Sequence, residues 1–148
     1  MLGTLTRKQC EHVLRSELVG RIGCYAAGRV YVVPVAFVFH KDHIYAHSKE
    51  GLKIKMMRRN AKVCFEVENR EGLNSWRTVI LWGKYEELTT AQEQKEVIKI
   101  LNDRFVGYKI SDTVLPTPNM NSPRQVEKAL KPVFYRISID EISGRFEK

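Results

Sequence analysis

Apolar and polar residues alternate along much of the chain with the period of two that is typical of half-buried β-strands. Six such segments are rich in β-branched and aromatic residues and are separated by short turns, a pattern that favours antiparallel hairpins. We predict strands at residues 18–26, 30–39, 43–48, 61–68, 76–88 and 132–142. Gly20 and Gly23, inside the first strand, indicate a bulge or the close approach of another part of the chain.

Helical periodicity occurs between these strands in four places. The strongest example is residues 91–105, where a threonine N-cap at position 89 or 90 precedes an apolar stripe at helical spacing. This stripe consists of Val97, Ile98, Leu101 and Phe105. We predict shorter helices at residues 7–16, 51–59 and 124–130, with loops at 69–75 and 106–123.

Strands in hairpin order, with helices inserted between them, argue against a parallel sheet of βαβ units. They predict a mainly β, α+β fold, in which six strands form a small closed antiparallel barrel with peripheral helices. The length of 148 residues corresponds to about one domain, so we expect residues 1–148 to form a single unit. The glycine motifs G-x-G-x-x-G and G-x-x-x-x-G-K-[ST] do not occur, so a nucleotide would have to bind on the barrel itself.

With 43% hydrophobic and 28% charged residues, the composition is that of a globular protein and not of a disordered chain. No apolar run approaches the ~20 residues that cross a bilayer, and the first residues contain no apolar signal segment. The three cysteines are odd in number and far apart, which favours a reduced, cytoplasmic protein. We therefore expect no membrane association.

Histidines at positions 40, 43 and 47 raise the question of a metal site. On one strand His43 and His47 would stand ~13 Å apart, whereas a metal ion needs each ligand within about 2.1 Å. No cysteine lies close enough in sequence to complete a ligand set. We expect no metal site, and the absence of a G-x-S-x-G motif argues against a hydrolase.

The net charge of +8 is compatible with nucleic acid, an acidic membrane surface or a phosphorylated small molecule as a partner. The segment HSKEGLKIKMMRRN is the most informative part of this basic chain. A strand ends at His47 and Ser48, a glycine turn follows, and a helix opens with Lys53 in its first turn. Because a helix N-terminus presents free N–H groups and a partial positive charge, this arrangement suits a phosphate. The alternative is an amphipathic helix whose lysines face solvent.

Pro34 lies in the middle of the predicted strand at 30–39, where it cannot donate a hydrogen bond to a neighbouring strand. It therefore marks a bulge or an edge strand. The free backbone groups of an edge could bind a planar heterocycle, and a simple edge strand without a ligand is the alternative.

Four stretches carry a resemblance to a known family. They read GRIGCYAAGRVYVVPVAFVF, IYAHSKEGLK, RRNAKVCFEV and RTVILWGKYEEL, and they extend from about Leu18 to Leu88. In their order and spacing, with weaker support from the tail ISGRFE, they resemble the pyridoxamine 5′-phosphate oxidase-like flavoproteins of the FMN-binding split-barrel superfamily. Within that superfamily they are most similar to the branch of nitroimidazole-resistance proteins.

This resemblance implies a split β-barrel and a homodimer that holds two FMN molecules at the subunit interface. The backbone around Val33, Pro34 and Val35 would face the flavin ring, and Lys53 would contact the phosphate.

The resemblance also implies roles for five further residues. His47 and Ser48 would line the cofactor near the ring and the ribityl chain. Thr78 stands where the oxidases tend to carry a glutamine that bonds to the flavin, with Trp76 and Arg77 close by.

Two departures from the family pattern bear on the substrate. The tail SGRFEK lacks the Arg-x-His element that holds substrate in the pyridoxamine phosphate oxidases, and Leu52 stands where those enzymes place an arginine. Pyridoxamine phosphate is therefore not the expected substrate.

The first functional interpretation is an FMN-dependent oxidoreductase that acts on a small planar acceptor, such as a quinone or a nitroaromatic compound. Its electrons would come from a reduced nicotinamide cofactor or another donor, and His47 is the only candidate for a catalytic acid or base. The alternative role for His47 is a hydrogen bond to flavin or water. The second interpretation is a barrel that stores or senses a flavin, or a basic barrel that binds nucleic acid. Between these partners we expect a small molecule and not a nucleic acid.

Overall fold

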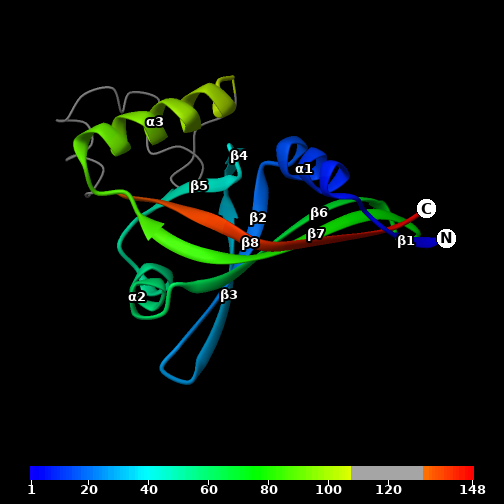
Figure 1. Ribbon diagram of the computed structural model, residues 1–148, viewed down its shortest axis with the longest axis horizontal. Coiled ribbons are helices and arrows are strands. Elements are labelled where there is room, and N and C mark those ends of the chain that lie inside the picture. Colours follow the sequence, from blue (N-terminus) through cyan, green and yellow to red (C-terminus); the bar gives the residue numbers. More distant parts are fainter. Residues whose placement is uncertain (108–131) are drawn as a thin grey trace.

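The protein is built on one curled antiparallel sheet, with helices on its outside (Figure 1). The structure is a computed structural model, and it describes residues 1–107 and 132–148. In chain order its elements are β1 (Leu2–Thr4), α1 (Arg7–Ser16), β2 (Val19–Ala26), β3 (Arg29–Ala36), β4 (Val38–His40), β5 (His43–Ser48), α2 (Leu52–Arg59), β6 (Lys62–Gly72), β7 (Ser75–Glu87), α3 (Ala91–Phe105) and β8 (Val133–Glu147).

The two edges of the sheet are consecutive in the chain. The strand order is β3-β2-β6-β7-β8-β5-β4, with β1 paired to the far end of β8. Only Phe37 separates β3 from β4, and among the described strands these two edges are not hydrogen-bonded to each other. The sheet therefore curls back on itself without closing. The closed barrel expected from the strand pattern is corrected, whereas the split barrel implied by the family resemblance is confirmed.

All six predicted strands are present, but their boundaries differ in informative ways. The strand predicted at 30–39 is divided at Phe37. The backbone N–H of Phe37 still donates to the carbonyl of Leu18, 3.0 Å away and next to β2, whereas from Val38 on the chain pairs with β5. The loop predicted at 69–75 is instead the tip of a β6–β7 hairpin, since polar cross-strand pairs continue the ladder up to Gly72 and Ser75. β8 runs on to Glu147 because β1, a strand too short to predict, pairs with its end.

The helices predicted at 7–16, 51–59 and 91–105 are confirmed as α1, α2 and α3. The loop predicted at 106–123 lies largely outside the described residues, and the helix predicted at 124–130 lies wholly outside them. None of the described helices is long and apolar enough to cross a membrane.

The interior of the barrel is aromatic at the point where its edges meet. Phe37 is fully buried, and its ring meets that of Phe65 edge to face, with the ring centroids 5.0 Å apart. α1 covers this interior with a buried face of Cys10, Val13 and Leu14.

α3 lies over the other side of β5 and builds a second, smaller cluster. The predicted apolar stripe is confirmed, since Val97, Leu101 and Phe105 are buried against Tyr45 and Phe134. β5 is consequently buried on both faces, one toward the barrel interior and one toward α3.

Glycine is required where β7 crosses β8. A Cβ on Gly83 would lie only 1.6 Å from the carbonyl oxygen of Ser138, and the register of the two strands shifts between Trp82 and Gly83. A close approach also holds at Gly20, as its sequence position predicts, because a Cβ there would lie 2.5 Å from the Phe65 ring. The absence of a side chain at Gly83 and Gly20 allows the strands to approach these groups and to bend around the core.

We predict that Phe37→Ala lowers the free energy of unfolding by roughly 3–5 kcal/mol, the usual cost of emptying a fully buried aromatic site. Chemical denaturation measures this loss. Phe146→Ala, at a half-buried position on β8, serves as the control and should cost clearly less. If Phe37→Ala costs no more than Phe146→Ala, Phe37 is not the residue that joins the two edges energetically.

Candidate functional site

The turn where β5 ends and α2 begins has several features that suit an anion. The N-cap of α2 is Gly51, which makes no side-chain capping hydrogen bond, and the first turn contains no acidic residue. The first N–H groups of this helix are therefore not satisfied by a cap, and their dipoles point toward the turn. Such an end of a helix attracts a negatively charged group.

Lys53 places a positive charge in the first turn of this helix. Its side chain is half-buried, and burial lowers its pKa below the ordinary value for lysine. Within the described part of the chain no carboxylate forms an ion pair with it. Because a partly desolvated charge without a counter-charge is unfavourable, an anion bound here would be stabilised by Lys53.

Cys24 lies in the buried core close enough to feel the charge of Lys53, and Tyr135 of the same core lies close to Cys24. Burial raises the pKa of the Cys24 thiol, and the neighbouring Lys53 charge lowers it in part. Tyr135 is fully buried, and within the described residues its hydroxyl makes no hydrogen bond. Burial and the nearby Cys24 raise the pKa of Tyr135. The interior under α2 therefore contains a polar group free to bond to a ligand.

Arg58 holds the turn before α2 in place. Its guanidinium binds both carboxylate oxygens of Glu50, at 2.9 and 2.6 Å, and both oxygens of Glu87 on β7, at 2.8 and 3.1 Å. Glu87 also accepts a hydrogen bond of 2.6 Å from Tyr85. The pKa of Glu87 is lowered, chiefly by the hydrogen bond from Arg58. We call the ion pairs of Arg58 with Glu50 and Glu87 the clamp. The clamp neutralises Glu50, whose carboxylate would otherwise repel an anion at the adjacent helix end.

β3 borders the same region and is an edge strand, as Pro34 predicts. Val33 and Val35 share a face with Tyr31, whose carbonyl oxygen lies 3.7 Å from the Cys24 sulfur. Val35 is buried, and Pro34 projects from the opposite, exposed face. The structure thus brings the β3 segment of the predicted site to the side of Cys24 and Lys53.

The two predicted residues at the end of β5 point in opposite directions. Ser48 directs its hydroxyl to the carbonyl of Lys49, 2.9 Å away, beside the turn that leads into α2. His47, on the opposite face of the strand, is buried toward the α3 side, with its ring centroid 6.4 Å from that of Phe134. Ser48 therefore joins Lys53, whereas His47 faces away from it.

Trp76, Arg77 and Thr78 lie far from α2 along β7. Cys24 pairs with Val63, and Val63 pairs with Gly83, which is six residues beyond Arg77 in β7. At 3.3 Å per residue, Arg77 lies roughly 20 Å from the row that holds Cys24.

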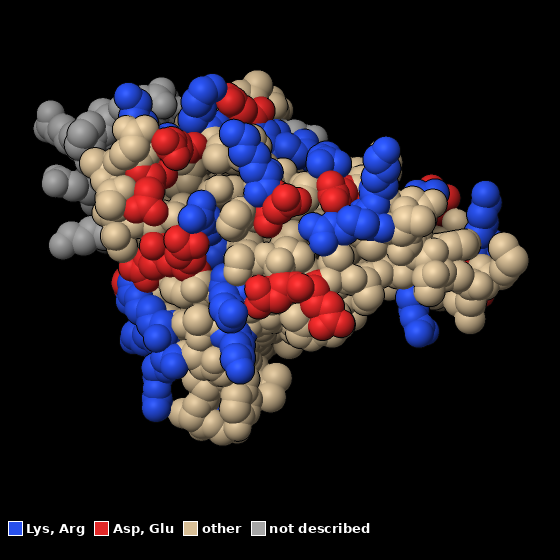
Figure 2. Space-filling view, in the orientation of Figure 1, with Lys and Arg blue, Asp and Glu red and all other residues tan. Residues whose placement is uncertain are grey.

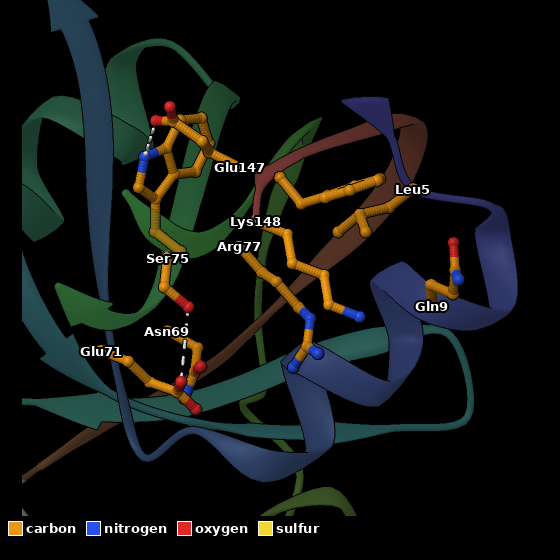
Figure 3. Close-up of a pocket in the computed structure, with 10 residues that line it drawn as sticks. Leu5, Gln9, Asn69, Glu71, Ser75, Arg77, Glu147 and Lys148 are labelled. Carbon is orange, nitrogen blue, oxygen red and sulfur yellow. Dashed lines mark hydrogen bonds between the residues drawn. The ribbon is translucent and has the colours of Figure 1, made fainter. Parts of the chain in front are cut away.

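Trp76, Arg77 and Thr78 also differ in the groups that they contact. Thr78 donates a hydrogen bond of 3.4 Å to Glu66, and Trp76 donates one of 3.0 Å to Glu147. Trp76 and Arg77 line a separate pocket at the tip of the β6–β7 hairpin (Figure 3). The structure does not bring them together with Lys53 in a single subunit.

The sheet also carries an unusual apolar surface opposite the barrel interior. Val30 and Val32 are 72% and 59% exposed, and Val32, Gly23, Cys64 and Trp82 follow one another across four paired strands. We call this surface the apolar outer face, and its exposed members are Val19, Tyr25, Val30, Val32, Ile80 and Trp82. Exposed apolar patches of this kind mark interaction surfaces.

Sequence reasoning missed the clamp and the polar groups of the core near Lys53. Arg58 and Glu87 are 29 residues apart, and no local pattern connects them. Tyr135 stands in an apolar strand and is indistinguishable there from an ordinary core residue. In residues 1–107 and 132–148, no three side chains of the metal-binding types lie close enough to hold a metal ion.

The chain thus combines a split antiparallel barrel with an uncapped helix N-terminus beside Lys53. The sequence model of the pyridoxamine 5′-phosphate oxidases matches residues 6–146, nearly the whole chain. The chain belongs to this family.

The chain is also similar to several solved structures and to one curated protein. A protein from Mesorhizobium loti described as FAD-binding has a TM-score of 0.76 and 28% identity, with 100% of this chain and 99% of that chain covered. A candidate 5-nitroimidazole antibiotic resistance protein from Bacteroides thetaiotaomicron has the same TM-score of 0.76 and 21% identity, covering 99% and 89% of the two chains. An uncharacterized protein of Rhizobium meliloti is 24% identical, over 95% of this chain and 92% of that protein.

Proposed function

We propose that this chain is an FMN-binding flavoprotein that holds the phosphate of FMN at the N-terminus of α2. The observation that carries the proposal is the uncapped helix end beside Lys53, a half-buried lysine that forms no ion pair with a carboxylate of the described residues. The family match over residues 6–146 and the FAD-binding relative from Mesorhizobium loti support a flavin as the phosphorylated ligand. Together they favour a flavin nucleotide over other phosphate compounds.

The residues of the site would bind and orient the cofactor. Lys53 and the first N–H groups of α2 would hold the phosphate, and Ser48 would accept or donate a hydrogen bond beside it. The edge of β3 around Val33, Pro34 and Val35 would face the ring. Bound flavin supplies redox chemistry, while the protein contributes position, exclusion of water and charge.

The reaction we propose is the oxidation of a reduced nicotinamide cofactor or another donor, with transfer of the electrons to a small planar acceptor. A quinone or a nitroaromatic compound fits this description. Tyr31 on β3 could offer a flat surface on the barrel side of the sheet, and Trp82 could offer one on the apolar outer face. No side chain is proposed as a catalytic acid, because His47 is buried toward α3.

FAD is the second candidate cofactor. The Mesorhizobium loti relative is described as FAD-binding, and exposed cations surround the start and outer side of α2 at Lys49, Lys55 and Arg59. Figure 2 shows blue side chains gathered over this helix. A second phosphate could bind there, and the mass of the flavin released from purified protein distinguishes FMN from FAD.

We further propose a cytoplasmic homodimer with the flavin at the subunit interface. β3 is an unpaired edge strand, and the apolar outer face continues from it across β2, β6 and β7. In Figure 2 the projecting end of the β2–β3 hairpin is mainly free of charged side chains. A second copy of the same surface would remove these apolar groups from water.

Non-catalytic storage of a flavin and binding of nucleic acid are the competing functions. The net charge of +8 is compatible with both. Nucleic acid is the weaker candidate, because Arg21 and Lys84, two cations of the apolar outer face, are each paired with a carboxylate.

We predict that Lys53→Glu weakens FMN binding at least tenfold. The substitution removes a charge-assisted hydrogen bond worth about 1.5–3 kcal/mol and puts a like charge beside the phosphate. Calorimetric titration with FMN and riboflavin measures the effect, and riboflavin, which lacks the phosphate, should bind both proteins alike. Lys55→Glu is the matched control, since it makes the same charge change on the exposed side of α2. An equal loss of FMN affinity in the two variants would mean that the net charge of the protein, and not a contact of Lys53 with the phosphate, determines binding.

We predict that the protein has a mass of about 34 kDa in solution, twice the 17.2 kDa of one chain. Val32→Glu on the apolar outer face should shift it toward the monomer, because the interface would bury an unpaired charge. Light scattering at micromolar concentration measures the mass. Leu73→Glu, at an exposed apolar residue of the β6–β7 turn, should leave the mass unchanged. A wild-type mass near 17 kDa would contradict the dimer.

We predict that NADH or NADPH bleaches the flavin absorbance of the loaded protein under anaerobic conditions. Since the donor is anionic and the protein carries a charge of +8, the rate should fall as salt is added. Quinones and nitroaromatic compounds are then tested as acceptors by the return of the absorbance. Reduction by dithionite alone would exclude nicotinamide as the donor. If no acceptor reoxidises the reduced protein faster than it reoxidises free FMN, non-catalytic storage of a flavin is favoured.

A further inference from the structure

A second pocket lies at the opposite end of the sheet from α2. It has a volume of about 270 Å³ and is enclosed by the start of α1, the tip of the β6–β7 hairpin and the end of β8. Figure 1 places this end at the right, beside β1, and α2 at the left. We call it the hairpin pocket, and its lining includes none of the residues proposed above to contact the phosphate or the flavin ring.

Two cations of the hairpin pocket have no acidic partner. Arg77 and Lys148 form no ion pair with a carboxylate of the described residues, although both line the pocket. Figure 3 shows their side chains side by side, with the nitrogen ends directed between the hairpin residues on one side and Gln9 on the other. Two adjacent like charges repel each other, so a shared anion would stabilise both.

The carboxylates of the pocket are already engaged. Glu147 accepts the indole N–H of Trp76 at 3.0 Å, and Glu71 accepts the hydroxyl of Ser75 at 3.3 Å. These bonds are formed away from Arg77 in the view of Figure 3.

Gln9, on the far wall, has a free donor. Its side-chain oxygen accepts the N–H of Thr6 at 2.8 Å as part of the α1 capping box. Its amide NH₂ group forms no hydrogen bond with the described residues and can donate to a ligand.

The balance of charge selects the kind of anion. Arg77 and Lys148 contribute two positive charges to the lining, while Glu71 and Glu147 contribute two negative ones. The main-chain oxygen of Lys148 accepts a hydrogen bond of 2.7 Å from the nitrogen of Met1. A dianion would be repelled by the two carboxylates, so a single negative charge fits better.

The pocket also has an apolar part and is small. Leu5, Trp76 and Phe146 supply the apolar side chains of its lining. A volume of about 270 Å³ falls just below the ~300–1,000 Å³ of ordinary ligand pockets. It therefore suits a compact ligand with a flat or branched apolar body.

We propose that the hairpin pocket binds a small monocarboxylate with an apolar body. Its carboxylate binds the guanidinium of Arg77 and the ammonium of Lys148, and its body packs against Leu5 and Phe146. The pocket is roughly 20 Å along β7 from the row of Cys24, so this inference does not rest on the proposed flavin function.

Benzoate, benzamide and phenyl phosphate test the proposal on the full-length protein. Calorimetric titration should give a dissociation constant for benzoate below about 10 mM, as expected for a ligand of nine non-hydrogen atoms. The neutral benzamide and the dianionic phenyl phosphate should each bind at least tenfold more weakly. The indole N–H resonance of Trp76, assigned with Trp82→Phe, should shift as benzoate is added.

Arg77→Gln should weaken benzoate binding at least tenfold and leave benzamide binding unchanged. Because Arg77 is exposed, this variant should keep the wild-type melting temperature. Lys95→Gln, which removes the same charge from the exposed face of α3, should bind benzoate like the wild type. Equal affinity for benzoate and benzamide, tighter binding of phenyl phosphate, or unchanged binding by Arg77→Gln would overturn the proposal.

Discussion

A single buried residue joins the two edges of the sheet, and the shape of the barrel depends on it. The strand path runs through seven strands from β3 to β4, yet only Phe37 lies between these strands in the chain. Seven strands can end where they began only if the sheet curls through nearly a full circle. The burial of Phe37 against Phe65 stabilises that curl, and Gly83 permits the bend where β7 crosses β8. As a consequence β3 remains an unpaired edge beside the opening.

The position of α2 at this opening explains why its N-terminus could bind an anion. The helix starts directly after β5 and lies over the barrel interior, so its first turn and Lys53 are partly removed from water without a counter-charge. Arg58 binds Glu50 and thereby keeps the nearest carboxylate neutralised and away from the helix end. Burial, an uncapped N-terminus and the clamp all favour a bound anion, and for this reason the phosphate interpretation is preferred to a solvated amphipathic helix.

Local sequence patterns predict those features of the fold that are determined by residues close together in the sequence. The stripe of α3, the edge position of Pro34 and the turn from Ser48 to Lys53 are of this kind. The strand break at Phe37 could not be predicted, because it depends on a change of partner strand, from β2 before this residue to β5 after it.

The residues of the predicted site were assigned as one group, but the sheet distributes them. His47 and Ser48 are adjacent in sequence and therefore face opposite sides of β5. Arg77 was expected near the flavin, and within one subunit β7 places it at the hairpin pocket, roughly 20 Å from the row of Cys24. The resemblance places these residues in the right strands, but only the curled sheet shows which of them meet.

The central claim is that the N-terminus of α2 holds the phosphate of a flavin. The most direct test is a backbone amide NMR titration of the unloaded protein with FMN, riboflavin and inorganic phosphate. We expect the amide resonances of Leu52, Lys53 and Ile54 to shift with FMN and with phosphate, and to shift far less with riboflavin. Equal shifts of these amides with FMN and riboflavin, or phosphate shifts confined to other parts of the chain, would contradict the claim.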